Sequence, residues 1–238
     1  MTRLMLAAAF AGFMALPAAA QTYGDTLAAQ HPEASGFRIA ATGKNGQPIA
    51  VSRGGSAGGV TVPLANSMGE PIGTLTVVTR RGSPARIAAQ LSRRIYVADN
   101  LAEPDPFVAG AARAPRAQAL VERMLAAHPD LVTLAMHVAP AGGTNTIIAS
   151  NFGRIGKAAD GDDADVIAHG TIRRELTNNG RRLAVELPQL DAKGNVIGAL
   201  STSFVVREGG QDAAYQQAVA VRDAIAKRTP SLEFLTRR

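Results

Sequence analysis

One stretch of the chain combines hydrogen-bonding side chains, cations and glycines in a pattern typical of a ligand-binding loop. Ser150 and Asn151 supply polar groups, and Arg154 and Lys157 supply two cations beside two glycines. A glycine lets a ligand approach the backbone closely, while Arg binds a carboxylate or phosphate in a bidentate fork and Lys adds a point charge. The pattern therefore predicts a site for a small anionic ligand, such as an organic acid or an amino acid.

Acidic residues and one histidine extend this candidate site. Four carboxylates follow the two cations, and one of them would take up the amine of an amino-acid ligand; they are Asp160, Asp162, Asp163 and Asp165. His169 is the one histidine of this stretch. The expected ligand-binding residues are Ser150, Asn151, Arg154, Lys157, Asp160, Asp163 and His169. In the alternative interpretation, the two cations are solvated loop charges paired with the neighbouring aspartates.

Metal and redox chemistry have little support in the sequence. The acidic segment lacks the EF-hand pattern, because Thr171 rather than Glu stands at the twelfth place counted from Asp160. The four histidines lack the spacing of a zinc helix. The absence of cysteine removes disulfides and thiol catalysis. We therefore expect neither a metal nor a cofactor.

Catalytic motifs are also missing. The chain has no Gly-x-Ser-x-Gly segment, no phosphate loop and no dinucleotide fingerprint. We therefore expect a protein that is not an enzyme. A metal-independent hydrolase stays open as an alternative, because catalytic triads are assembled in space rather than along the chain.

The elements that must position the site occur twice. The segment from Leu27 to Pro32 reappears from Leu125 to Pro129, and residues 60–75 reappear as residues 185–200. Each copy has the order helix, extended stretch, Pro-containing strand, turn, strand and helix. Two copies of one module are therefore expected. The second copy carries an insertion, residues 152–180, that the first lacks.

Periodicity and turn residues place the elements of each copy. A helix over residues 117–125 ends before Pro129, and a helix begins at Ser83-Pro84, with Ser as the N-cap and Pro at the first position. In the last strand, Ser201 and Ser203 point to the face opposite Phe204. The expected strands of the two copies are 37–41, 49–52, 59–64, 73–79, 131–138, 146–150, 182–187 and 198–206.

The first twenty residues have the features of a secretory signal peptide. Arg3 is followed by an apolar stretch over residues 4–16, and Pro17 precedes three alanines. We expect cleavage after Ala20 and a mature protein in the periplasm. The alternative, an uncleaved anchor, fits less well because a spanning helix needs roughly 20 strongly apolar residues.

The net charge of the chain bears on which kinds of partner it could bind. The formal net charge is +6, but no basic stripe carries the interleaved aromatic residues that stack on nucleic acid bases. We therefore expect no nucleic acid partner. A basic excess is compatible with an anionic ligand.

Several short motifs together resemble a known family. In the second copy they are residues 148–151 (Ile-Ala-Ser-Asn), 154–157 (Arg-Ile-Gly-Lys), 187–188 (Leu-Pro) and 191–198 (Asp-Ala-Lys-Gly-Asn-Val-Ile-Gly), echoed in the first copy by 51–52, 62–63 and 68–73. They resemble the periplasmic PAS-like sensor module called PDC or Cache, present here as a tandem pair. The resemblance implies an α+β fold of two PAS-like modules, each a mostly antiparallel five-stranded sheet flanked by helices. It also implies a ligand between the sheet and the insertion.

The expected organisation follows from these features. It comprises a signal peptide at 1–20, a first module at 21–99, a Pro-containing linker at 100–116 and a second module at 117–238 with insertion 152–180. No membrane helix or signalling domain follows the second module in the sequence, so we expect a sensor that acts through a membrane or envelope signalling partner. The first module would be structural or would form the surface of a homodimer. An envelope interaction module without a small ligand is the alternative.

Overall fold

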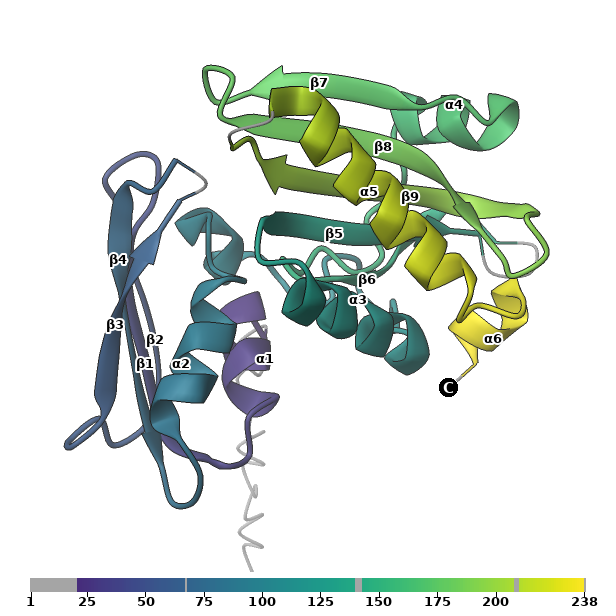
Figure 1. Ribbon diagram of the computed structural model, residues 1–238. Coiled ribbons are helices and arrows are strands. Elements are labelled where there is room, and N and C mark those ends of the chain that lie inside the picture. Colours follow the sequence, from purple (N-terminus) through teal and green to yellow (C-terminus); the bar gives the residue numbers. More distant parts are fainter. Residues whose placement is uncertain (1–20, 67, 140–142, 208–209, 238) are drawn as a thin grey trace, which may run out of the picture.

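The computed structural model describes residues 21–66, 68–139, 143–207 and 210–237. The chain forms two α+β modules, each built on one antiparallel sheet with flanking helices (Figure 1). The expected fold class is thereby confirmed. The expected signal peptide lies outside the described residues.

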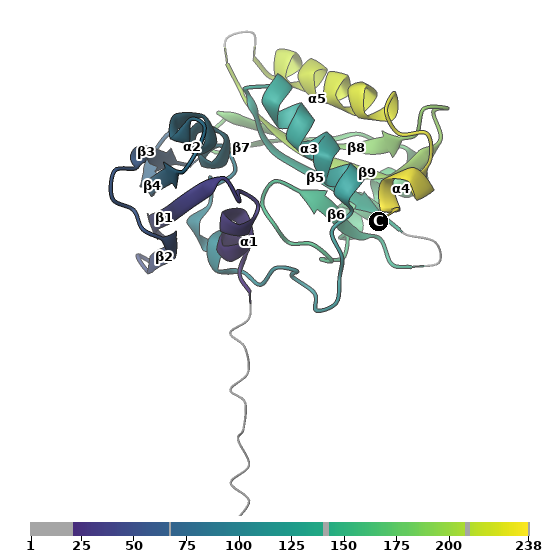
Figure 2. The same ribbon diagram turned by 90° about the horizontal axis from the view of Figure 1, so that it is seen from below.

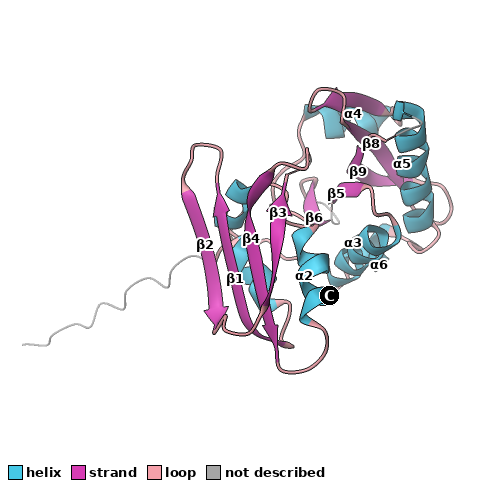
Figure 3. Cartoon of the chain, turned by 60° about the vertical axis from the view of Figure 1, so that its left-hand side comes forward, coloured by secondary structure: helices cyan, strands magenta, loops and turns pink. Residues whose placement is uncertain are grey.

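The first module contains a four-stranded sheet with the order β2-β1-β4-β3. Phe37 and Ile39 alternate with exposed residues on one face of β1, and Leu75 and Val77 do so on β4, as expected for strands with one buried face. Helices α1 and α2 complete this core and lie between the sheet and the second module (Figure 1, Figure 3). The elements are α1 (Tyr23–Ala29), β1 (Ala34–Thr42), β2 (Pro48–Gly54), β3 (Val60–Ala65), β4 (Pro71–Thr79), α2 (Pro84–Ser92) and the 3-10 helix η1 (Ala98–Ala102).

The second module repeats this topology and adds one strand. Its sheet has the order β6-β5-β9-β8-β7, in which β5, β6, β8 and β9 take the places of β1, β2, β3 and β4. The additional strand β7 comes from the insertion, so only the second sheet has the five strands expected for both. The elements are α3 (Pro115–Ala127), β5 (Leu131–Val138), β6 (Thr146–Ser150), α4 (Gly161–His169), β7 (Arg173–Thr177), β8 (Arg182–Leu190), β9 (Val196–Val205), α5 (Gly210–Ala226) and α6 (Leu232–Thr236).

The two faces of the second sheet differ in chemistry. Helices α3 and α5 lie side by side on one face (Figure 2) and enclose a large apolar core that includes Met136, Leu200 and Phe204. The opposite face, which we call the outer face, contacts α4 instead. Because side chains alternate along a strand, the outer face receives the intervening small and polar residues: Thr133, Ala135, His137, Ala184, Glu186, Ser201 and Ser203.

Buried polar contacts join the two modules. The hydroxyl of Tyr23 in α1 donates a hydrogen bond of 2.6 Å to the carbonyl of Asn151, where the insertion leaves β6. Arg94, just after α2, forms an ion pair with Glu122 in α3. Both contacts link helices of the first module to elements of the second. Within the described residues, no helix has the length and apolarity needed to cross a membrane.

The tyrosine contact generates a stability prediction. Tyr23→Phe removes the hydroxyl that donates to the Asn151 carbonyl and leaves this buried acceptor without that hydrogen bond. We therefore expect a loss of about 1–2 kcal/mol in the free energy of unfolding. Urea unfolding followed by circular dichroism measures the loss. Tyr215→Phe is the matched control, because the described residues offer its hydroxyl no hydrogen-bond partner. Equal midpoints for the two variants would contradict the prediction.

Candidate functional site

Helix α4 carries one carboxylate onto the outer face of the second sheet. Asp160 caps the helix by accepting hydrogen bonds from the backbone amides of Asp162 and Asp163 at 3.1 and 3.2 Å. The side chain of Asp163 reaches back to the amide of Asp160, which completes a capping box. The helix ends at Gly170, which adopts a left-handed conformation. These local signals fix the orientation in which Asp163 faces the sheet.

Asp163 meets a histidine and a serine from two neighbouring strands. Its Oδ2 lies 3.0 Å from Nδ1 of His137, a contact that becomes an ion pair when the imidazole is protonated. The Ser201 hydroxyl donates to its Oδ1 at 3.2 Å. Burial alone would raise the pKa of Asp163, but these contacts and the Asp160 amide outweigh it and hold the pKa below its usual range.

These three residues have the types found in a catalytic triad, but they are connected differently. As in a triad, His137 directs Nδ1 to the acid and Nε2 to the serine. Here, however, the Ser201 Oγ is 3.5 Å from Nε2 and also donates directly to Asp163. Ser201 also lies on a central strand that pairs with β5 on one side and β8 on the other. Its backbone therefore provides no free amide for an oxyanion.

A second carboxylate lies beside this cluster. Glu186 on β8 is the cross-strand neighbour of Ser201 on β9 and of Arg173 on β7. Its Oε2 is buried without a hydrogen bond in the described structure, and the Arg173 Nε is 4.0 Å away. Burial, together with the charges of Asp163, Asp160 and Asp162, raises the pKa of Glu186 to about 6. This carboxyl therefore has one cation at the distance limit of an ion pair and no hydrogen bond to its buried oxygen.

Glu186 and Arg173 line a cavity of about 200 Å³ between α4 and strands β7 and β8. Arg173 is also paired with Asp162 at the mouth of the cavity, at 3.0 Å, and about half of each of these two side chains is exposed. Ala184 contributes a small side chain to the wall. The cavity is lined by two arginines, Arg173 and Arg174, and by carboxylates, so it offers charges of both signs to a small polar molecule.

The far end of the outer face is closed by the first module. Tyr96, which follows α2, lies edge-on to Phe152 of the insertion, with ring centroids 6.4 Å apart. The Arg182 guanidinium lies over the Tyr96 ring at 5.4 Å and bonds to Ser203 on the outer face. The first module therefore touches the same sheet face as the insertion.

The structure separates the residues that the sequence suggested as one site. Ser150 is buried and donates to the Gly153 carbonyl, which stabilises the start of the insertion. Asn151 accepts a hydrogen bond from the Leu134 amide at 2.8 Å and donates to the Val132 carbonyl at 2.9 Å, so its side chain is bound to β5. Both polar side chains are thus engaged within the fold.

Arg154 has a carboxylate partner inside the protein. Its Nε and Nη2 donate to the two oxygens of Glu103 at 2.9 and 2.7 Å, and Nη2 lies 3.3 Å from Oδ1 of Asn100. The hydrogen bonds to Glu103 raise the pKa of Arg154. Lys157 is exposed, and His169 is exposed and pairs with Asp165 at 2.9 Å. Of the suggested residues, Asp160 and Asp163 are the two that belong to the outer-face cluster.

Sequence reasoning missed His137, Arg173, Glu186 and Ser201. The available signal was the alternation in the last strand, which directs Ser201 and Ser203 away from the apolar core. The polar residue His137, within the otherwise apolar run of β5, was a second sign that this face of the sheet is polar. Among the described residues, no group of three or more His, Asp or Glu side chains is arranged to hold a metal ion.

Comparison with known proteins yields remote structural similarities. No protein-family model matches the chain, and no curated protein matches it. The inducer-binding domain of the PobR transcription factor from Acinetobacter, in complex with 3-hydroxybenzoic acid, is 13% identical with a TM-score of 0.31, and the match covers 51% of this chain and 99% of that chain.

Two proteins from Pseudomonas aeruginosa are similarly remote. HmgR is 12% identical with a TM-score of 0.29, and the match covers 66% of this chain and 76% of that chain. PelD in complex with c-di-GMP is 14% identical with a TM-score of 0.27, and the match covers 90% of this chain and 79% of that chain. Similarity at this level does not define a site, so the functional argument rests on the geometry above.

The pairing of Arg154 is testable by a double-mutant cycle. We expect Arg154→Ala and Glu103→Ala each to lower the free energy of unfolding, and the double variant to lose less than the sum. The coupling energy should be about 1 kcal/mol for a partly buried bidentate pair. Urea unfolding of the four proteins gives the coupling. A coupling near zero would mean that Arg154 is available to an external anion.

The raised pKa of Glu186 predicts a pH-dependent stability difference. The folded protein holds this proton more tightly than the unfolded chain, whose pKa is near 4.5, so the carboxyl destabilises the fold increasingly as the pH rises from about 4.5 through about 6. Glu186→Gln removes this cost. We expect the variant to gain about 1 kcal/mol relative to the wild type between pH 4.5 and pH 7.5.

Thermal unfolding of both proteins at the two pH values measures this gain. Glu175→Gln, which removes an exposed carboxylate on the adjacent strand β7, is the matched control. A Glu186→Gln effect that does not change with pH would contradict the assignment.

Proposed function

We propose that this protein is a periplasmic sensor that binds a small molecule on the outer face of its second module, between α4 and strands β7 and β8. One observation carries the proposal. Glu186 has a buried carboxylate oxygen without a hydrogen bond in the described structure, and it borders a cavity that also contains Arg173. A buried polar group without a partner costs free energy, so a ligand that supplies a donor would be stabilised there.

The charges of the cavity favour an amino acid over a simple organic acid. The ligand amine would donate to Glu186, and the ligand carboxylate would accept the bidentate fork of Arg173. For this, Arg173 would exchange its exposed contact with Asp162 for the ligand, a small cost because surface ion pairs contribute little. The cavity of about 200 Å³ suits a small ligand rather than a nucleotide.

The proposal also concerns how ligand binding would be passed on as a signal. The protein would bind its ligand without catalysis and act through a membrane or envelope signalling partner. Contacts of Tyr96 in the first module and Glu103 in the linker with the outer face and the insertion would let these parts respond to the ligand. The alternative is an envelope interaction module without a small ligand, and it predicts no ligand effect at this cavity.

A thermal-shift screen tests the proposal. The panel contains the protein amino acids, organic acids, nucleobases and divalent ions, and a ligand at a hundred times its Kd adds roughly 2.7 kcal/mol. We expect an amino acid to raise the midpoint, and Glu186→Gln and Arg173→Ala each to abolish this shift. Because the amine needs the ionised carboxylate, the shift should strengthen as the pH rises through about 6.

Arg154→Ala is the matched control, because it removes one arginine whose guanidinium is already bound to Glu103. It should keep the shift. A shift that is lost in Arg154→Ala and kept in Arg173→Ala would place the ligand at the start of the insertion. No shift with any compound would favour the interaction module.

A further inference from the structure

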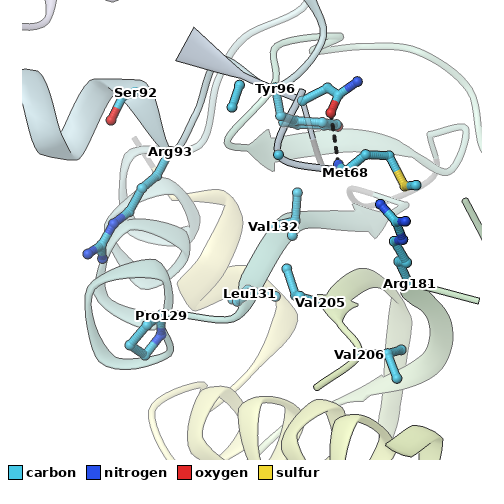
Figure 4. A pocket seen from close by; sticks show the side chains of 13 residues that line it. Met68, Ser92, Arg93, Tyr96, Pro129, Leu131, Val132, Arg181, Val205 and Val206 are labelled. Atoms are coloured by element: carbon cyan, nitrogen blue, oxygen red, sulfur yellow. Dashed lines mark hydrogen bonds between the residues drawn. The ribbon is translucent and has the colours of Figure 1, made fainter. Parts of the chain in front are cut away.

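A larger cavity, of about 410 Å³, lies between the two modules and shares no residue with the site proposed above. One wall is formed by Asn66, Met68 and Gly69, between β3 and β4, and by the end of α2; the other is formed by the starts of β5 and β8 and the end of β9 (Figure 4). Its volume lies in the range of roughly 300–1,000 Å³ that is usual for small-molecule sites. We call it the inter-module cleft.

The floor of the cleft is apolar. Val132 and Val205 come from adjacent strands and project from them in Figure 4, and Met68 lies across from Val132 on the first module. Leu131 also lines the cleft but is nearly completely buried in the core of the second module. Val132 and Val205 are only partly buried, although each belongs to a strand of the sheet. The cleft therefore presents apolar surface that a ligand would remove from water.

The charge of the cleft has one sign. Arg93 and Arg181 line it from opposite modules, and no aspartate or glutamate is among its described lining residues. Neither guanidinium has an ion-pair or hydrogen-bond partner in the described part of the chain. By contrast, the other polar side chains are occupied: Asn66 bonds to Glu70 at 2.7 Å, and Ser92 donates to the Ala89 carbonyl at 3.2 Å. Arg181 is thus the polar group available to a ligand inside the cleft, and the Arg93 guanidinium, which points away from Met68 and Arg181 in Figure 4, adds a positive charge at its edge.

We propose that the inter-module cleft binds an organic anion with an apolar body, which bridges the two modules. Arg181, whose guanidinium extends toward Met68 across the cleft in Figure 4, holds the acidic group. The apolar body lies on the floor formed by Val132 and Val205. Arg93 contributes a second positive charge from the first module. Such a ligand differs in class from the amino acid proposed for the outer face, because the cleft offers no carboxylate to an amine.

A pair of fluorescent probes separates charge recognition from apolar contact. The anionic probe is 8-anilinonaphthalene-1-sulfonate, and the neutral probe is N-phenyl-1-naphthylamine, which has the same ring system without the sulfonate. We expect saturable binding of the anionic probe to the mature protein. Arg181→Ala should weaken the anionic probe at least fivefold while changing the affinity of the neutral probe by less than twofold.

Two further variants complete the test. Arg81→Ala is the matched charge control, because Arg81 is exposed and lies at the opposite end of β4 from the β3–β4 turn; it should leave both affinities unchanged. Val132→Phe fills the floor and should weaken both probes. Equal affinities of the anionic probe for Arg181→Ala and Arg81→Ala would overturn the proposal. If Val132→Phe does not fold, the exposed Arg181 still provides the decisive comparison.

Discussion

The arrangement of the second module depends on how its insertion is attached at Asn151. The Asn151 side chain bonds to the backbone of β5 on both its donor and acceptor sides, and its carbonyl receives the Tyr23 hydroxyl from the first module. A buried amide with all of these partners is costly to displace, since any lost partner leaves a polar group unsatisfied. The attachment point is therefore shared by the sheet, the insertion and the first module. Everything downstream, including α4 and β7, is positioned from it.

From this point the insertion builds a polar site on a sheet face that would otherwise be exposed. The capping box of Asp160 and Asp163 turns one carboxylate toward His137 and Ser201, and that carboxylate is well supplied with partners. Glu186, one strand away, is not. Its nearest cation, Arg173, is 4.0 Å away, and its buried oxygen receives no hydrogen bond in the described structure. A partly buried carboxylate with so few partners costs free energy that an apolar side chain would not, and the proposed ligand site rests on this cost.

Local structure was predictable from the sequence where the signal was local. The apolar runs predict strands at 131–138 and 146–150, and the structure has β5 and β6 at those bounds. Ser83 and Pro84 begin α2 as their chemistry indicates. The repeat predicts the shared topology of the two sheets, but only the insertion contributes a fifth strand, so the first sheet has four. Edge strands without an apolar pattern, such as the exposed β7, leave little trace in a sequence.

The site was less predictable because its contacts are distant along the chain. Arg154 has the residue type and glycine neighbours of an anion site, but its carboxylate is Glu103, 51 residues earlier in the linker. Spacing within a loop cannot reveal such a partner. Similarly, the raised pKa of Glu186 arises from burial and from aspartates on a helix that precedes its strand, and neither is visible as a motif.

The ion pair between Glu103 and Arg154 is one of several contacts at the boundary between the modules. Glu103 joins Arg154 to the linker, Tyr23 joins α1 to Asn151, and Tyr96 contacts Phe152 and Arg182. All three contacts connect the first module or the linker to the insertion or to the outer face. A ligand that reorders the insertion would therefore change contacts at the module boundary, and a ligand in the inter-module cleft would act on the same boundary from the other side. If both ligands change the contacts at this boundary, binding of either ligand changes the affinity of the protein for the other. Thermodynamic linkage requires that the factor is the same in both directions.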